Sequence, residues 1–205
     1  MKYPILEIFD SVQGEGRYSG VPATFIRFAG CNLSCPWCDT EEQLQSCGTL
    51  MELQDIVDKV HFPNVVMTGG EPTLQDLTPL CTAIKIKYSR SCFLMIETNG
   101  TRAVPLAFNY IACSPKPQSG YSIHESILSR EHLIPIDYKY VVDTNLRVQD
   151  IHIPDRAGVE SIVYLQPEYY EGKSSVKRAY EFVKELSNLT EVRLGLQAHK
   201  VWEVR

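Results

Sequence analysis

Short runs of apolar, β-branched and aromatic residues recur along the chain, and turn-forming Gly, Pro, Asn or Asp residues mark many of their ends. Runs of this kind are typical of buried β-strands. The spacing of the runs leaves room for helices or long loops between them, as in a sheet of mostly parallel strands. The strands predicted in this way are residues 23–30, 64–70, 92–100, 110–116, 135–143, 161–167 and 192–197.

Apolar residues at helical spacing predict three helices between these strands. The first covers residues 49–60, where Thr49 is the expected N-cap and Glu52 completes a capping box. The other two cover residues 74–88 and 174–186. Because active sites of such α/β folds lie at the carboxyl ends of the strands, polar residues that follow the strands are expected to meet there.

The predicted fold is an α/β partial TIM-like barrel with mostly parallel strands and few helices. A closed eightfold barrel usually takes about 250 residues, and this chain has 205. Several helices are therefore expected to be reduced to loops, among them the Ser-, Pro- and Gly-rich segment 115–134. Because no segment has the composition of a linker, residues 1–205 are predicted to form one domain.

Composition and charge argue against several classes of partner. The formal net charge is −5, so the chain lacks the basic character of proteins that neutralise nucleic-acid phosphates. No apolar run approaches the roughly 20 residues needed to span a bilayer, and acidic residues interrupt the N-terminal stretch where a secretion signal would be apolar. We expect a cytoplasmic protein that binds neither nucleic acid nor membranes.

The chain contains seven cysteines, an odd number in a compartment that is expected to be reducing, so a disulfide framework is not expected. Cys81, Cys92 and Cys113 lie among apolar residues and are predicted to be structural thiols, and Cys47 an ordinary thiol. The remaining cysteines fall in one short loop, "AGCNLSCPWCDT", and need another explanation. They are Cys31, Cys35 and Cys38.

Three thiols in one loop are compatible with zinc, with an iron-sulfur cluster or with a reactive cysteine. A structural zinc site needs four ligands, so it would require Cys47 or a distant His. The spacing C-x3-C-x2-C lets each thiol hold one iron of a four-iron cluster, which leaves the fourth iron open to a small molecule. Gly30 and Pro36 shape the backbone of this loop.

The stretch "CNLSCPWC" resembles the cysteine signature of radical S-adenosylmethionine (SAM) enzymes. The resemblance implies a 4Fe-4S cluster on the three cysteines and SAM on the open iron, where cleavage of the cofactor yields a 5′-deoxyadenosyl radical. The stretch "VVMTGGEPTLQ" resembles the superfamily's methionine-binding motif, in which two glycines let the backbone approach the ligand and Glu71 accepts from its amine.

The flanking sequence "SVQGEGRYSGVPATFIRFAG" is similar to the 7-carboxy-7-deazaguanine synthase family, and "ETNGT", "SPK", "QP" and "LQAHK" extend the similarity over nearly the whole chain. The resemblance implies conversion of 6-carboxy-5,6,7,8-tetrahydropterin to 7-carboxy-7-deazaguanine with loss of ammonia, in the biosynthesis of queuosine and related deazapurines. In that reaction the radical takes the hydrogen at C6 and ring contraction follows. No catalytic side chain is assigned, because the cofactor radical carries the chemistry.

The same resemblance implies a set of residues for the pterin. Arg27 also stands out by itself, because a guanidinium without a partner would be costly in an otherwise apolar strand. We favour an Arg27 that binds the substrate carboxylate over one in a structural ion pair. The implied substrate-binding residues are Gln13, Glu15, Arg27, Gly70, Glu97 and His199.

A second set is implied for the cofactors. The residues expected around SAM are Trp37, Gly69, Glu71, Thr98, Ser114, Lys116 and Gln166. Thr40 is implied to coordinate a Mg²⁺ ion that bridges to the substrate, in keeping with the preference of that ion for oxygen ligands. Asp39 could support the waters of the metal or approach the cofactor, and both roles stay open.

The resemblance also implies a homodimer and a transient reductant such as flavodoxin. The ending "HKVWEVR" differs from the Gly- or Pro-containing tail of many relatives, and we hypothesise that the terminal carboxylate of Arg205 reaches the pocket. Two alternatives remain. One is an activating enzyme that takes hydrogen from a glycine of a protein partner, and the other is a non-catalytic zinc module.

Overall fold

A computed structural model describes residues 1–38, 48–155, 159, 161–170 and 173–204. The described residues form a nine-stranded sheet in the order β11-β8-β7-β6-β5-β4-β2-β1-β3, together with a hairpin of β9 and β10. The strands of the large sheet are β1 (Lys2–Val12), β2 (Pro22–Phe28), β3 (Thr49–Glu52), β4 (Asn64–Gly69), β5 (Phe93–Thr98), β6 (Tyr110–Cys113), β7 (Ile136–Val142), β8 (Ile162–Pro167) and β11 (Val192–Leu194). The hairpin pairs β9 (Tyr169–Tyr170) with β10 (Lys173–Ser174).

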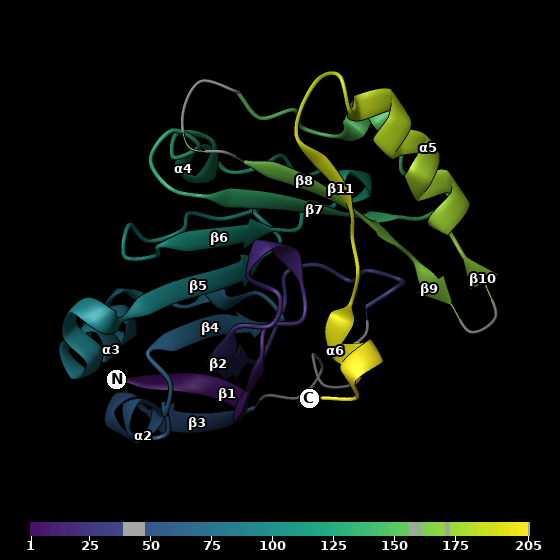
Figure 1. The fold of residues 1–205 in the computed structure, drawn as a ribbon. Helices are drawn as coiled ribbons and strands as arrows, with labels where there is room; N and C mark the ends of the chain where they lie inside the picture. The colour runs from purple at the N-terminus through teal and green to yellow at the C-terminus, as the bar shows by residue number, and fades with distance from the viewer. Residues whose placement is uncertain (39–47, 156–158, 160, 171–172, 205) are drawn as a thin grey trace.

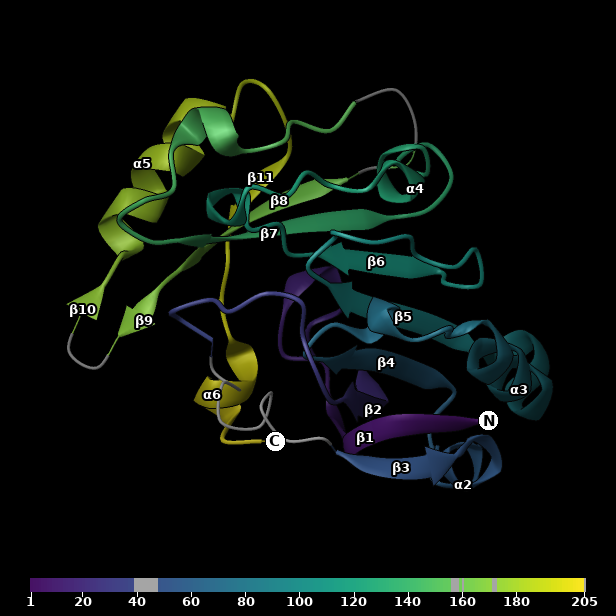
Figure 2. The same ribbon diagram turned by 180° about the vertical axis from the view of Figure 1, so that it is seen from behind.

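From β2 to β11 every neighbouring pair of strands in the large sheet is parallel. At the other edge, β1 pairs antiparallel with both β2 and β3. The sheet is curved, and the chain after β11 crosses the carboxyl ends of the strands to α6 (Figures 1 and 2). The predicted α/β fold, a partial barrel of mostly parallel strands, is confirmed.

The helices are few and short, and they pack mainly against one face of the sheet. They are α2 (Leu53–Asp58), α3 (Thr78–Tyr88), α4 (Glu125–Leu128), α5 (Val176–Leu186) and α6 (Ala198–Trp202). Short 3-10 turns cover Gly16–Tyr18, Pro72–Leu74, Ser89–Ser91, Pro117–Ser119 and Val148–Asp150. Buried residues of α2, α3, α4 and α5 join the main apolar core on the convex face. Among the described residues, none of the helices combines the length and apolar character needed to cross a membrane.

The alternation of side chains along each strand separates this core from the opposite face. In β2, Ile26 and Phe28 belong to the main core, whereas Phe25 and Arg27 line a cavity on the concave face. At the amino-terminal ends of the strands the concave face is filled by a small apolar cluster that includes Phe25, Val66 and Met95. Toward the carboxyl ends of the strands, the side chains on the concave face become polar.

The N-terminal region differs from the prediction in two ways. Residues 49–52 are extended, because they pair with Lys2–Ile5 of β1, and α2 begins only at Leu53. The capping box predicted for Thr49 and Glu52 is therefore wrong, and Glu52 is the N-cap of α2 but its side chain makes no capping hydrogen bond to the helix. The eleven-residue strand β1 was not predicted, because its apolar residues are mixed with Glu7 and Asp10.

Other element bounds shift by a few residues. The helix expected at 74–88 begins at Thr78, after the 3-10 turn Pro72–Leu74, and the one expected at 174–186 begins at Val176. The segment predicted as a loop, 115–134, contains the short helix α4. Cys81 and Cys113 are fully buried and Cys92 half-buried, as expected for structural thiols, whereas Cys47 lies outside the described residues. The assignment of the chain to one domain stays a prediction.

Candidate active site

A cavity of about 640 Å³ opens at the carboxyl ends of the parallel strands. Its volume lies in the range typical of sites for small molecules and cofactors. Fifteen of the residues predicted for the two ligands and the cluster line it. They are Gln13, Glu15, Arg27, Cys31, Cys35, Trp37, Cys38, Gly69, Gly70, Glu97, Thr98, Ser114, Lys116, Gln166 and His199. Glu71 is not among the lining residues, and Thr40, Asp39 and Arg205 lie outside the described residues.

The three cysteines of the loop after β2 are half-buried and share the wall of the cavity. Cys31 Sγ accepts from the backbone N–H of Leu33 at 3.4 Å and lies 3.9 Å from Nδ2 of Asn99. Burial raises the pKa of the Cys31 and Cys35 thiols, so binding of a metal must displace their protons. The described residues contain no group of three His, Cys, Asp or Glu side chains placed to hold a single ion.

The chemistry of this wall fits an iron-sulfur cluster and an adenosyl cofactor. Each cysteine of a cluster binds through its thiolate, and three thiols around one cavity supply three such ligands. Trp37 lines the cavity. Its indole Nε1 is buried and has no hydrogen-bond partner among the described residues, so this donor is unsatisfied. A residue between Cys35 and Cys38 thus offers both an aromatic face and an N–H to a bound group.

The Gly-Gly turn after β4 forms the floor beside the cysteine loop. Gly69 has φ +134°, and a Cβ atom on it would lie 2.2 Å from the backbone oxygen of Phe28. Gly70 donates its N–H to the same oxygen at 3.1 Å. Only glycine fits at position 69, because both the backbone conformation and the close approach to β2 exclude a side chain.

Glu71 lies behind this wall and is completely buried. Its Oε1 accepts from the backbone N–H of Thr73 at 3.0 Å and from the hydroxyl of Thr98 at 2.7 Å, and its Oε2 accepts from the N–H of Asn99 at 2.7 Å. The carboxylate therefore holds the turn after β5 in place. The direct contact with the cofactor amine predicted for Glu71 stays a prediction, and the contacts seen are with the protein itself.

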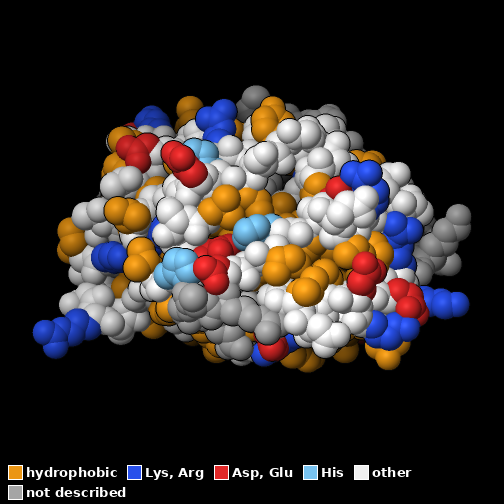
Figure 3. All heavy atoms as spheres, turned by 90° about the horizontal axis from the view of Figure 1, so that it is seen from above, with side chains coloured by type: hydrophobic (Ala, Val, Ile, Leu, Met, Phe, Trp, Pro, Cys, Tyr) orange, Lys and Arg blue, Asp and Glu red, His pale blue; other side chains and the backbone are white. Residues whose placement is uncertain are grey.

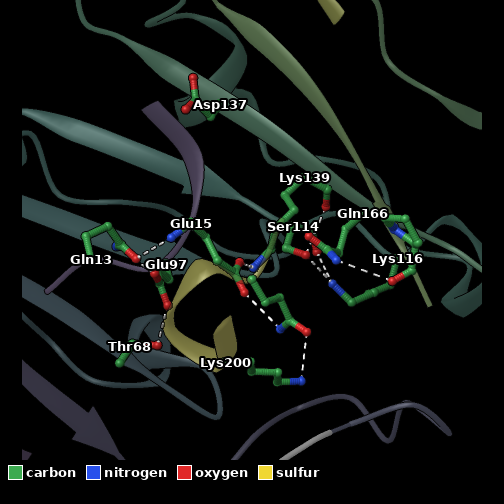
Figure 4. Close-up of polar contacts among 12 residues, drawn as sticks. Gln13, Glu15, Thr68, Glu97, Ser114, Lys116, Asp137, Lys139, Gln166 and Lys200 are labelled. Carbon is green, nitrogen blue, oxygen red and sulfur yellow. Dashed lines mark hydrogen bonds and ion pairs between the residues drawn. The ribbon is translucent and has the colours of Figure 1, made fainter. Parts of the chain in front are cut away.

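Glu97, at the end of β5, is fixed by two neighbours (Figure 4). Gln13 Nε2 donates to Oε1 at 3.0 Å, and the Thr68 hydroxyl donates to Oε2 at 2.8 Å. The Oε1 atom of Gln13 in turn accepts from the backbone N–H of Glu15 at 3.1 Å. These bonds connect the loop after β1 to the strand that carries Glu97, so two residues expected to bind substrate support each other.

Arg27 forms the structural ion pair that was not favoured on sequence grounds, and its predicted contact with the substrate carboxylate stays a prediction. It lines the cavity, and its Nε donates to Oε1 of Glu7 on the neighbouring strand at 2.8 Å. The bond to Glu7 uses one of the five N–H donors of the guanidinium. The ion pair orients the side chain without removing it from the cavity wall.

Glu15 is held from two further elements. It forms an ion pair with Lys139 of β7, and its Oε1 accepts from Nε2 of Gln197 at 2.9 Å. Both partners line the cavity and neither was predicted. Like Arg27, Lys139 is a cation in a largely apolar strand, although that strand also carries Asp137. The position of Gln197 depends on how the chain after β11 returns to the site.

The "SPK" turn after β6 brings a buried cation to the cavity. Ser114 donates its hydroxyl to the carbonyl of Lys139 at 3.0 Å, and Nζ of Lys116 donates to the Ser114 hydroxyl oxygen at 2.6 Å (Figure 4). Burial, helped by the nearby charge of Lys139, lowers the pKa of Lys116 to about 8. Gln166, at the end of β8, donates to the Pro167 carbonyl at 3.3 Å.

The surface seen from above the molecule carries Lys and Arg interspersed with Asp and Glu, and this face shows no continuous basic patch (Figure 3). The polar side chains that lie close together are those that line the cavity, where a small molecule could contact them.

Comparison with known proteins relates the chain to characterised families. Residues 25–112 match the model of the radical SAM superfamily. The chain is 33% identical to the 7-carboxy-7-deazaguanine synthase of Haemophilus influenzae over 97% of this chain and 92% of that protein, and 34% identical to that of a Synechocystis species over 100% and 95%. The crystal structure of QueE from Escherichia coli superposes with a TM-score of 0.71 and 27% sequence identity, and the match covers 97% of this chain and 95% of that one.

Proposed function

Because the chain belongs to the 7-carboxy-7-deazaguanine synthase family of radical SAM enzymes, we propose that it converts 6-carboxy-5,6,7,8-tetrahydropterin to 7-carboxy-7-deazaguanine with loss of ammonia. The observation that carries the proposal is that one cavity unites the three thiols with Gln13 and Arg27. A pterin acid needs acceptors and donors for its ring and a cation for its carboxylate, and this wall offers all of them. The product is a precursor of queuosine and other deazapurines.

The cofactors are proposed to occupy the side of the cavity formed by the loops after β2, β4, β5 and β6. When bound, a 4Fe-4S cluster and SAM together supply a 5′-deoxyadenosyl radical that takes a hydrogen atom from the substrate. Cys31, Cys35 and Cys38 would hold the cluster. The residues that would hold SAM are Trp37, Gly69, Glu71, Thr98, Ser114, Lys116 and Gln166, with Glu71 accepting from the cofactor amine as well as supporting the turn after β5.

The pterin is proposed to lie on the opposite side, against the loop after β1 and the chain that leads into α6. The Glu15 carboxylate would accept from ring N–H groups and Arg27 would bind the acid. Glu97, whose two oxygens are already fixed by Gln13 and Thr68, would hold the ring at the end of β5. Gly70 and His199 complete the set. Fixing the substrate in this way and excluding water are the contributions of the protein to the reaction.

A Mg²⁺ ion on Thr40 belongs to the proposal as well, because a hydroxyl and substrate oxygens are suitable ligands for this ion. Thr40 lies outside the described residues, so the support comes from the family resemblance of "CDT" alone. A homodimer, a reductant such as flavodoxin and a place in the cytoplasm are proposed on the same resemblance. Removal of Mg²⁺ by a chelator should reduce turnover of the carboxypterin and leave the iron content unchanged.

The decisive experiment is an anaerobic assay of the reconstituted protein with SAM, a reductant and the carboxypterin. The expected result is the deazaguanine acid, detected by mass, together with ammonia. A protein that cleaves SAM only in the presence of a glycine-containing protein partner would point to an activating enzyme instead. A colourless protein that contains zinc and no iron or sulfide would contradict the proposal altogether.

The cysteine assignment has a matched control within the chain. Cys31→Ala should abolish the iron and sulfide content and the visible absorption of the cluster. Cys81→Ala should leave them intact, because Cys81 is buried in the convex core and burial raises its pKa to about 12, which keeps it a thiol. Iron and sulfide analysis of both variants provides the comparison.

A further inference from the structure

We propose that Lys139 is a positioning residue that fixes the Glu15 carboxylate as the acceptor for the ring N–H groups of the pterin. This inference rests on the proposed function and adds to it a residue of β7 that holds the substrate loop. The two side chains come from distant parts of the sequence and meet as an ion pair at the wall of the cavity.

The alternation of β7 places two charged residues on the concave face. Tyr138 and Tyr140 point into the convex core, whereas Asp137 and Lys139 lie among the residues that line a small inner space beneath the main cavity. Asp137 accepts from the backbone N–H of Arg17 at 3.1 Å and from its Nε at 2.7 Å. One strand therefore holds the substrate loop at two points, Arg17 through Asp137 and Glu15 through Lys139.

Asp137 is itself fixed within the fold. The hydroxyl of Tyr110 on β6 donates to Oδ2 at 2.7 Å, and the Asp137 side chain is almost completely buried. A Cβ atom on Gly16, whose φ is +69°, would lie 2.9 Å from that same hydroxyl oxygen. The loop thus contacts β6 closely at Gly16 and is bonded to β7 through Arg17, so these strands fix the position of its backbone.

Lys139 and Gln197 share the two oxygens of Glu15 between them. Lys139 pairs with Oε2 and Gln197 donates to Oε1 at 2.9 Å, and the side chains of Lys139 and Glu15 are only 26% and 14% exposed. Each carboxylate oxygen has a second lone-pair direction for another donor. A ligand in the cavity therefore meets a carboxylate whose orientation is already determined, which reduces the entropy lost on binding.

The charge of Lys139 also determines the protonation of Glu15. Burial alone would raise the pKa of Glu15, but the charge and hydrogen bond of Lys139, the hydrogen bond of Gln197 and the charge of His199 together lower it. The other charged groups nearby are Glu97, which is linked through Gln13, and Lys116, whose charge acts on Lys139. Without Lys139 two of the effects that lower the pKa of Glu15 are lost, so Glu15 takes up a proton at higher pH than before.

Direct binding tests this role without relying on turnover. Reconstituted protein with SAM and no reductant is titrated calorimetrically with the carboxypterin between about pH 6 and about pH 7.5, below the pKa of about 8 at which Lys116 loses its charge. At neutral pH, Lys139→Met should weaken binding about tenfold, as expected for the loss of one charge-assisted contact. The loss should grow as the pH falls, because Glu15 then becomes protonated and ceases to be a pure acceptor. Lys139→Arg, which keeps the charge, should restore most of the affinity and the pH profile of the unaltered protein.

Two further comparisons separate positioning from a general structural effect. Because Lys139 acts through Glu15, the double variant Glu15→Gln/Lys139→Met should bind no more weakly than Glu15→Gln alone. Lys184→Met is the matched control, since it breaks an exposed Lys-Glu ion pair on α5 and should leave binding unchanged.

The outcomes distinguish this inference from the proposed function. Additive losses in the double variant, or a loss that does not depend on pH and that Arg fails to rescue, would overturn the role of Lys139. Normal binding by Lys139→Met would do the same while the proposed function stands. If the unaltered protein neither binds nor converts the carboxypterin, the proposed function fails first.

Discussion

The imidazole of His199 packs directly on Gly14, so that a Cβ atom at position 14 would lie 2.1 Å from its Nδ1. The two residues are also joined through the backbone, because the N–H of Ala198 donates to the carbonyl of Gly14 at 2.8 Å. The start of α6 and the loop after β1 are therefore one unit of the cavity wall. A side chain at position 14 would separate them.

We predict that Gly14→Ala raises the KM for the carboxypterin by about tenfold or more, because displacing His199 removes a polar contact worth about 1.4 kcal/mol. Steady-state kinetics under anaerobic conditions would measure the effect. Gly120→Ala is the matched control. It places an alanine at φ +76° with no atom within 4 Å, so it should cost some stability through backbone strain and leave KM unchanged. An unchanged KM in Gly14→Ala would show that His199 does not contact the substrate.

Arg27→Ala should weaken binding of the carboxypterin by roughly tenfold to a hundredfold, as expected for the loss of a charge-assisted contact. Uncoupled cleavage of SAM should be largely retained, because Arg27 lies with the substrate residues. Arg27→Lys should give an intermediate loss, since lysine keeps the charge without the planar fork. Parallel measurement of substrate affinity and of 5′-deoxyadenosine formation provides the test, and equal loss of both would mean that Arg27 contacts the cofactor.

Glu71→Gln should lower stability and cofactor binding together. The buried carboxylate accepts from Thr73 and Thr98 on one oxygen and from Asn99 on the other, so an amide group must leave one of these donors without an acceptor, at a cost of about 1–3 kcal/mol. Thermal unfolding and SAM titration measure the two effects. Glu181→Gln, an exposed change on α5, should alter neither. Loss of cofactor affinity with unchanged unfolding would favour the direct amine contact.

Binding of SAM should weaken as the pH rises above about 8, because the pKa of Lys116 is lowered to about 8 and the side chain loses its positive charge above that value. A neutral amine is a weaker partner for the carboxylate or ribose oxygens of the cofactor. The Lys116→Arg side chain stays charged throughout this range, so the SAM affinity of that variant should not fall above about pH 8 for this reason. Any effect of the titration of SAM itself is the same for both proteins. Identical pH profiles for the two proteins would exclude Lys116 from the contact.

Much of the fold and most of the site could be predicted because the relevant signals are local. Strands β2, β4, β5, β6 and β8 are largely apolar runs, as expected when both faces of a parallel strand are covered. Arg27 was recognisable as a cation in such a run, and the three cysteines by their spacing. The order of the motifs after successive strands then placed their residues at one edge of the sheet.

The features that were missed depend on distant contacts. Residues 49–52 have the periodicity of a helix start, but pairing with β1 keeps them extended, and local patterns do not reveal that partner. The bonds of Glu71 to Thr98 and Asn99, which hold the turn after β5, were not predicted, because they join residues far apart in the sequence. Gln197 reaches Glu15 only because the chain after β11 crosses the cavity, a path that no short motif records.

Adjacent residues of each strand face opposite sides of the sheet, so neighbouring substitutions should have different effects. In β2, β5 and β7 the neighbours Ile26 and Arg27, Ile96 and Glu97, and Tyr138 and Lys139 serve different surfaces. In a saturation screen, harmful substitutions should therefore fall into two classes that alternate residue by residue. Changes at Ile96 or Tyr138 should deplete the amount of folded protein in cells, whereas changes at Glu97 or Lys139 should leave abundance near normal and reduce product formation. Substitutions on the concave face could therefore change the reaction during evolution, while the core residues that stabilise the fold stay the same.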